Sequence, residues 1–272
     1  MAKTRVLIAV KTYPTLSNKY DELVCTAVFL EDGSWIRIYP IPFRKLECEY
    51  RYKKWQWITI DIEKNTSDFR IESYKPIDLS AEIELGEVIK TEKCWAKRKE
   101  YALKKVWTNM TELIKAAKET NLSLAVVKPT KVINFIWEND SRDWDKNKLA
   151  NIKAKQQQLD LFKPHEIFEV AKKLPYKFSY IFETEDGEKR KIMIEDWELG
   201  MLYWNSLKNA KGDENIACEK VKQKYFVSML DDTDFYFFMG TTKQWHNVSS
   251  NPFVIIGTFY PKKDNSNQLS LF

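Results

Sequence analysis

The acidic residues near position 196 and the histidine at position 246 are the side chains in this sequence whose types most suggest catalysis. Glu195, Asp196 and Glu198 stand together just ahead of a helical pattern, and clustered carboxylates can bind Mg²⁺ or act as acid and base. Acidic residues also cap helix N-termini, where the helix dipole favours them, and we prefer this interpretation. His246 needs an orienting partner to act as a general base, and the sequence identifies none. Asp196, Glu198 and His246 are therefore catalytic candidates only for an alternative, enzymatic function.

Metal and cofactor chemistry receive little support from the sequence. The histidines and cysteines are scattered, with no metal-binding spacing, at His165, His246, Cys25, Cys48, Cys94 and Cys218. The seven glycines are isolated, so the sequence has no glycine-rich loop to hold a phosphate. We therefore expect neither a bound metal nor a cofactor, and an NTPase or a dinucleotide-binding enzyme is disfavoured.

Two pentapeptides have the residue types of a protein-docking motif. They are Gln158-Leu159-Asp160-Leu161-Phe162 and Gln268-Leu269-Ser270-Leu271-Phe272. Both resemble the motif by which proteins dock on the bacterial sliding clamp. The resemblance implies that the glutamine amide hydrogen-bonds at the mouth of a clamp pocket. The leucine and phenylalanine side chains would fill an apolar slot, as anchor residues do in small interfaces.

The two copies of this motif differ in their surroundings. The terminal copy follows a polar spacer, so it can leave the folded body and reach a pocket. The internal copy lies between two expected folded units, and its apolar side chains could instead pack those units together. Both interpretations stay open for the internal copy. Two accessible copies would raise the avidity for a clamp ring.

Cations and aromatic rings are interleaved through the first part of the chain, and a basic run follows from Lys90 to Lys118. Bases stack on aromatic faces while cations hold phosphates, so this mixture predicts a nucleic-acid contact, with DNA preferred over RNA. The alternative is that the rings form a core and the lysines a solvated helix face. The predicted contact residues are Lys11, Tyr13, Trp35, Arg37, Tyr39, Arg44, Lys53, Lys54, Trp55, Lys97, Arg98 and Lys104.

Short apolar and alternating runs predict a strand-rich fold that would position these residues. Asp32-Gly33 and Asp186-Gly187 each separate two such runs, which is typical of a hairpin because glycine reaches positive φ without strain. The expected strands cover residues 5–10, 23–30, 35–39, 55–62, 123–127, 177–184, 188–194, 235–239 and 253–260.

Helical periodicity is clearest after residue 100. One apolar stripe predicts a single long amphipathic helix, and its members are Leu103, Val106, Trp107, Met110, Leu113, Ile114 and Ala117. Shorter helices are expected over residues 199–207 and 214–230. The polar stretch 138–158 is interpreted as a linker or an exposed helix.

Four sequence blocks resemble a bacterial family with a dual OB-fold domain, found near mobile elements and phage-defence genes. The blocks are Val10-Lys11-Thr12-Tyr13-Pro14, Trp35-Ile36-Arg37-Ile38-Tyr39-Pro40 with Arg44, Ile194-Glu195-Asp196-Trp197-Glu198 with Leu202-Tyr203-Trp204, and Phe237-Phe238-Met239-Gly240-Thr241 with Asn251-Pro252-Phe253. The resemblance implies two OB-like units and contact with nucleic acid or a nucleotide. It implies no particular reaction.

We therefore expect a β-rich α+β protein with two small OB-like barrels or antiparallel sheets and inserted amphipathic helices. Residues 1–137 would form the first unit with its basic helix, 138–163 a polar linker, 164–262 the second unit and 263–272 a tail. Scattered cysteines and the lack of a secretory-type apolar segment at the N-terminus predict a cytoplasmic protein without a membrane partner.

Two functions follow from these expectations. The leading hypothesis is a non-catalytic accessory protein that docks on the sliding clamp and binds nucleic acid in repair, replication or phage defence. The alternative is an enzyme of a bacterial defence system that processes a nucleotide or nucleic acid.

Overall fold

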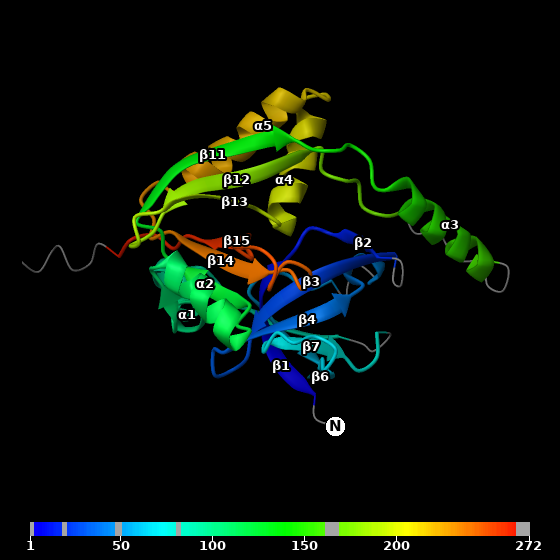
Figure 1. Cartoon of the computed structure of the whole chain (residues 1–272), viewed down its shortest axis with the longest axis horizontal. Helices are drawn as coiled ribbons and strands as arrows, with labels where there is room; N and C mark the ends of the chain where they lie inside the picture. Colours follow the sequence, from blue (N-terminus) through cyan, green and yellow to red (C-terminus); the bar gives the residue numbers. More distant parts are fainter. Residues whose placement is uncertain (1–2, 18–20, 47–50, 80–82, 161–168, 265–272) are drawn as a thin grey trace, which may run out of the picture.

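The computed structural model describes residues 3–17, 21–46, 51–79, 83–160 and 169–264. Within these residues the chain forms three sheets, most of whose strands pair antiparallel, and the helices lie around them (Figure 1). The predicted β-rich α+β class is confirmed. None of the helices in these residues combines the length and apolar character needed to cross a bilayer.

The first sheet curls into a half-barrel. Its strands pair in the order β6-β7-β4-β3-β1-β5-β8, with β2 against β3. The predicted hairpin between β3 and β4 is confirmed, and Gly33 takes the positive φ that the turn needs (+79°). The strands are β1 (Thr4–Lys11), β2 (Thr15–Ser17), β3 (Asp21–Phe29), β4 (Trp35–Ile41), β5 (Gln56–Ile60), β6 (Ile62–Lys64), β7 (Ser73–Pro76) and β8 (Glu84–Val88).

Two further sheets contain the rest of the strands. The four-stranded sheet has the order β15-β14-β10-β9, and the three-stranded sheet has the order β11-β12-β13. The second predicted hairpin, β12 to β13, is also confirmed, with Gly187 at φ +72°. The strands are β9 (Val106–Trp107), β10 (Leu124–Val127), β11 (Lys131–Asn139), β12 (Tyr176–Glu183), β13 (Lys189–Met193), β14 (Tyr236–Thr241) and β15 (Phe253–Phe259).

The helices lie around these sheets, and several of them contribute buried side chains to the apolar cores. They are η1 (Phe43–Lys45), α1 (Glu92–Ala102), α2 (Met110–Thr120), α3 (Lys146–Asp160), α4 (Trp197–Asn209), α5 (Glu214–Lys222) and the π-helical turn η3 (Gln223–Ser228). Helix α4 covers the predicted range 199–207 and extends beyond it at both ends, and α5 with η3 covers 214–228 of the predicted range 214–230. Helix α3 projects from the body (Figure 1), which agrees with the exposed-helix interpretation of the polar stretch.

The predicted long helix over residues 103–117 is wrong. Helix α1 ends at Ala102, and Val106 and Trp107 instead form β9, which pairs parallel with β10. A new helix starts at Met110 because Asn109 is extended and its side chain accepts the Glu112 N–H as an N-cap. Only the later part of the apolar stripe is helical.

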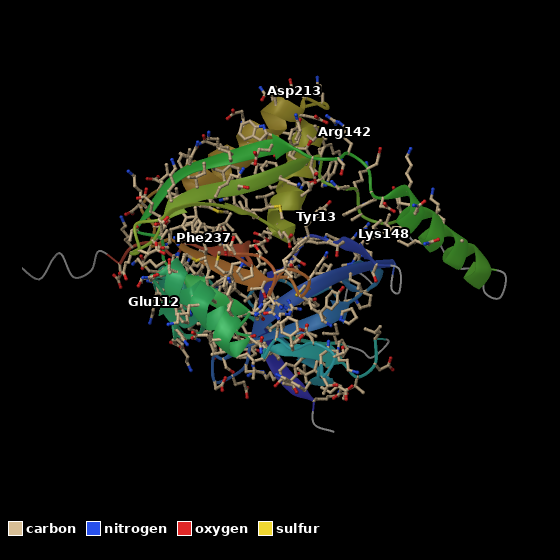
Figure 2. All side chains as sticks on the ribbon, viewed as in Figure 1. Tyr13, Glu112, Arg142, Lys148, Asp213 and Phe237 are labelled. Atoms are coloured by element: carbon tan, nitrogen blue, oxygen red, sulfur yellow. The ribbon has the colours of Figure 1, made fainter. Side chains whose placement is uncertain are left out.

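The four-stranded sheet is the middle layer of the molecule. One of its faces packs on the half-barrel, where Phe238 meets Phe29 and Trp55. Its other face, which carries Phe237 (labelled in Figure 2), packs on the three-stranded sheet. The Phe237 ring contacts that of Tyr180 there. The half-barrel has its own apolar interior. The chain passes from the first sheet to the other two at β9, so β10 and β11 belong with the C-terminal sheets. We expected from the sequence that the first unit would extend to residue 137.

Candidate functional site

A short extended segment, residues 194–196, runs between β1 and β15. Glu195 N donates to Ile255 O over 2.8 Å, and Tyr13 N donates to Glu195 O over 3.3 Å. Because side chains alternate along an extended chain, Glu195 and Asp196 face opposite sides of this segment. Glu195 lines a cavity, whereas Asp196 is buried near Lys54 and Glu198.

Asp196 is the N-cap of α4, as the preferred interpretation of the acidic cluster predicts. Its Oδ1 accepts the Glu198 N–H (3.1 Å), and its Oδ2 accepts the Tyr225 hydroxyl (3.2 Å). Burial raises the pKa of the Asp196 carboxyl, and the nearby Lys54 charge opposes that rise. The acids do not converge, because Glu195 faces the other way. Within the described residues, no three acidic, cysteine or histidine side chains are grouped as metal ligands.

A β-bulge in β1 directs Lys11 toward Asp196. Ile8 pairs with Val28 but Val10 pairs with Ala27, so one extra residue shifts the alternation of side chains. Val10 then joins the core against the middle sheet, while Lys11 turns to the other face. Lys11 Nζ donates to Tyr52 O (3.2 Å) and lies 4.2 Å from the Phe43 ring centroid. Burial lowers its pKa to about 8, although Glu198 and Asp196 act against this.

Lys54 approaches the same acids from the segment before β5. Its Nζ lies 3.4 Å from Glu198 Oε2 and donates to Thr258 O over 3.3 Å. Burial lowers the pKa of Lys54, but the charges of Glu198 and Asp196 outweigh that effect and the pKa lies above its ordinary value. Lys11, Lys54, Asp196 and Glu198 therefore form one charged cluster between the half-barrel and α4.

His246 has a structural position. Its side chain is buried, with Nδ1 2.8 Å from Thr241 Oγ1 and Nε2 3.0 Å from the carbonyl oxygen of Ala117. A carbonyl only accepts, so Nε2 carries the proton and Nδ1 accepts from the threonine hydroxyl. Burial lowers the pKa of His246 and keeps the ring neutral. Its only lone pair is already used, so His246 is not available as a general base, and it does not lie with Asp196.

A second cluster, which we call the Trp95–Tyr260 surface, combines rings with cations. It consists of Trp95, Tyr260, Arg98, Lys54 and Lys224. The two ring centroids are 5.2 Å apart, Arg98 lies 5.1 Å from the Trp95 centroid, and Lys224 Nζ lies 5.9 Å from that of Tyr260. Both rings are partly exposed. This arrangement can stack a base and hold a phosphate.

An unusual backbone presents Trp95. Lys93, Cys94 and Trp95 all have positive φ (48°, 49° and 64°), so α1 begins with a left-handed turn. This conformation is costly for residues with a Cβ, and such strain concentrates at functional positions. Trp95, Tyr260 and Lys224 were not identified as contact residues from the sequence. For these three, the one available signal was that Trp95 lies inside the basic run.

The predicted nucleic-acid residues are spread over several places. Arg98 and Lys54 belong to the Trp95–Tyr260 surface, and Lys11 lies behind it in the charged cluster. Trp55 is only 3% exposed, and Trp35 packs on Phe29 with ring centroids 3.9 Å apart. Trp55 is therefore a core ring without a face open to a base, as the alternative interpretation predicts, whereas Trp35 is partly exposed and packs against the same core.

The other predicted contacts lie elsewhere. Tyr13 sits between the half-barrel and α4 (Figure 2), where its hydroxyl donates to Lys172 O and accepts from Trp204 Nε1. Arg44 forms an ion pair with the buried Glu22. The remaining predicted residues are Arg37 and Tyr39, which line the cavity beside Glu195, and Lys53, Lys97 and Lys104, which are exposed.

The clamp-like peptides are largely outside the described residues. The terminal copy, 268–272, lies beyond the last described residue, and so do Leu161 and Phe162 of the internal copy. Residues 158–160 form the C-terminal end of α3. The prediction that these peptides bind a clamp stays a prediction.

Comparison with known families divides the chain where the sheets do. A model described as a domain of unknown function, DUF8758, matches residues 2–104, and a model described as a domain of unknown function, DUF8757, matches residues 106–272. No curated protein matches the chain. The second model covers more than half of the sequence, and the chain therefore belongs to the DUF8757 family.

Proposed function

We propose that the protein is a cytoplasmic, non-catalytic accessory protein of bacterial DNA metabolism. It docks on the sliding clamp through its C-terminal pentapeptide and binds single-stranded nucleic acid at the Trp95–Tyr260 surface. The observation that carries this proposal is the match of residues 268–272 to the clamp motif at all five positions. Repair, replication and phage defence are the settings in which such a protein would act.

The position of the tail supports its role as the docking peptide. Strand β15 ends at Phe259, and residues 262–264 are exposed at the surface. The polar spacer that leads to Gln268 therefore starts outside the core. A short apolar peptide on a polar spacer can reach a pocket without any loss of folded structure.

The internal copy is less suited to docking. Residues 158–160 are helical, whereas a clamp pocket takes an extended peptide, so the end of α3 would have to unwind before binding. That unwinding weakens binding, because the free energy spent on rearranging and ordering the peptide reduces the net affinity. The proposal therefore gives clamp docking to the tail alone.

The Trp95–Tyr260 surface supports nucleic-acid binding through its chemistry. Two neighbouring rings flanked by Arg98 and Lys224 provide stacking and charge together. Glu198, which is about half exposed, pairs with Lys54 and reduces the positive charge nearby. We therefore expect stacking to contribute more of the affinity here than it does on a purely basic groove.

Calorimetric titration of the protein into a purified bacterial sliding clamp tests the docking. We expect micromolar binding that falls at least about tenfold in a Leu271→Ala/Phe272→Ala variant, because the anchors carry most of the energy. The matched control is Leu161→Ala/Phe162→Ala, which should bind like the intact protein. The proposal is wrong if the intact protein fails to bind or if the tail variant binds equally well.

The charged cluster favours one second candidate, an enzyme that acts on a nucleotide or nucleic acid. Lys11 has a lowered pKa and Asp196 a raised one, and oppositely shifted groups side by side are typical of acid–base sites. Incubation of the purified protein with ATP, a single-stranded oligonucleotide and Mg²⁺ would test this. Turnover that disappears in Lys11→Met while clamp binding persists would favour the enzyme, whereas no turnover would favour the accessory protein.

A further inference from the structure

A cavity of about 490 Å³ lies between the half-barrel and the start of β15. It lies on the side of the extended segment 194–196 that faces away from Asp196, and segments matched by both family models form its walls. Ligand pockets commonly have this size and lie between such units. The lining residues that matter here are Arg37, Tyr39, Arg70, Glu195, Thr242 and Lys243.

Arg37 is a buried charge without adequate partners. Its side chain is 3% exposed. Nη2 donates to Ser123 O at 3.2 Å, and the Cys25 side chain is a further close neighbour that interacts with the guanidinium. Nε and Nη1, which carry three of the five N–H groups of a guanidinium, are buried and have no partner. A buried charge left in this state is strongly unfavourable unless something pairs with it.

The neighbouring acids are already engaged by other groups. Asp68 accepts from Arg70 Nη2 at 2.6 Å and from the Ser73 hydroxyl at 2.8 Å. Glu72 accepts from the backbone N–H and the hydroxyl of Ser123. Each of these carboxylates therefore has a local structural partner, and neither makes a hydrogen bond to Arg37. An anion that enters the cavity would provide the missing acceptor.

Other residues that line the cavity add a hydroxyl group, a positive charge and an apolar surface. The Thr242 hydroxyl is buried without a partner, and Lys243 adds an exposed positive charge at the wall, with Nζ donating to Ser67 O. Glu195 also lines the cavity, and burial raises the pKa of its carboxyl. Val254 and Ile256 provide an apolar side. The cavity thus combines donors for an anion with a surface for an apolar moiety.

A second hollow of about 330 Å³ lies beside the first. It shares Glu195, Thr242, Gln244 and Val254 with the cavity, and Trp245 lies in its wall with 52% of its surface exposed. An exposed tryptophan ring is a stacking platform for a flat, conjugated group. The two adjacent hollows therefore suit a ligand with an anionic end and an aromatic end.

We propose that this double hollow binds a nucleotide, with its phosphate paired to Arg37 and its base against Trp245. Phosphate binding there requires the Arg37 guanidinium to rotate toward the cavity that it lines, because Nε and Nη1 are buried. This site is separate from the clamp peptide and from the Trp95–Tyr260 surface. It holds a free nucleotide or the terminal nucleotide of a strand by the same groups.

Calorimetric titration of the full-length protein with the four nucleoside 5′-monophosphates, and separately with inorganic phosphate, tests the proposal. We expect at least one monophosphate to bind more tightly than phosphate. Arg37→Met should weaken that binding about 30-fold or more, because truncating one partner of a buried charge pair is costly. Trp245→Ala should weaken the monophosphate about fivefold or more and leave phosphate unchanged.

Folding controls distinguish this role from a structural one. Ser123 O also accepts the Thr241 N–H, so Arg37→Met leaves no acceptor orphaned there and removes an unpaired charge. Its melting temperature without ligand should equal or exceed that of the intact protein. Val248→Ala, an exposed control near Trp245, should bind the monophosphate normally. Failure of all four monophosphates to bind at millimolar concentration, or unchanged binding by Arg37→Met, would overturn the proposal.

Discussion

The ammonium group of Lys54 lies 3.4 Å from the carboxylate of Glu198, and this ion pair joins segments that two different family models match. The pair is backed by the carbonyl of Thr258 and by the buried Asp196. Because Lys54 also borders the Trp95–Tyr260 surface, the proposed nucleic-acid contact depends on both segments being folded against each other.

Stacking on Trp95 is the first testable consequence. Trp95→Ala should weaken the binding of a fluorescent single-stranded oligonucleotide by about 1–3 kcal/mol, or about 5- to 150-fold, because one stacked base loses its platform. Fluorescence anisotropy measures this directly. Trp137→Ala is the matched control, since Trp137 is also a partly buried ring near a lysine but lies on β11. Equal affinities for the two variants would place the oligonucleotide elsewhere.

The pH dependence of stability should report the burial of Lys11. Its pKa is about 8 in the folded protein against 10.5 ordinarily. Below pH 8 Lys11 is charged in both the folded and the unfolded state, so folding includes the full cost of desolvating its ammonium group. Between about pH 8 and 10.5 the unfolded state binds more protons, so the free energy of unfolding should rise with pH.

Urea unfolding at several pH values between 7 and 10.5 measures this effect. The rise should be smaller in Lys11→Met, which lacks the titrating group, and unchanged in Lys53→Met, an exposed lysine nearby. A Lys11→Met variant with the same pH profile as the intact protein would show that Lys11 is solvated rather than buried.

His246 should matter for stability and not for chemistry. His246→Ala removes a buried ring and leaves the Thr241 hydroxyl and the Ala117 carbonyl without that partner, so we expect a loss of about 2–4 kcal/mol in unfolding free energy. The intact protein should also lose stability as pH falls below 6.5, since only the unfolded state then gains a proton at this residue. Trp245→Ala, an exposed neighbour, should change stability by less than about 0.5 kcal/mol. A His246→Ala variant of unchanged stability would contradict this role.

Gly200 should not tolerate a side chain. A Cβ there would lie 2.2 Å from Cδ2 of Tyr13, and two hydrogen bonds hold that tyrosine in place. Gly200→Ala should therefore destabilise the protein by about 1–3 kcal/mol, although glycine to alanine within a helix is ordinarily stabilising. Asn205→Ala, at an exposed position of α4, is the control and should be neutral or slightly stabilising. Thermal unfolding of both variants decides between these outcomes.

Local signals in the sequence predict much of this fold. The Asp32-Gly33 and Asp186-Gly187 turns specify both hairpins, because the turn geometry depends on neighbouring residues alone. The failure at Val106 and Trp107 has a non-local cause. These residues fit a helical stripe, but pairing with β10 holds them in a sheet, and that pairing depends on tertiary contacts rather than on local periodicity.

The candidate sites were harder to predict than the fold. Capping by Asp196 follows from its position before a helix, but its proximity to Lys11 depends on a bulge and on a strand contact between distant segments. Trp95 is exposed through a left-handed turn that contains no glycine. Arg37 looks like a surface cation in the sequence, and only the packed structure shows that it is buried with unpaired nitrogens.

The central claim is that one molecule links the clamp to nucleic acid. The most direct test is fluorescence anisotropy of a labelled single-stranded oligonucleotide with the protein at saturation, followed by titration of unlabelled sliding clamp. The account predicts a further rise in anisotropy as a ternary complex forms, absent with the Leu271→Ala/Phe272→Ala variant. No further rise with the intact protein, or a fall as the clamp displaces the oligonucleotide, would contradict it.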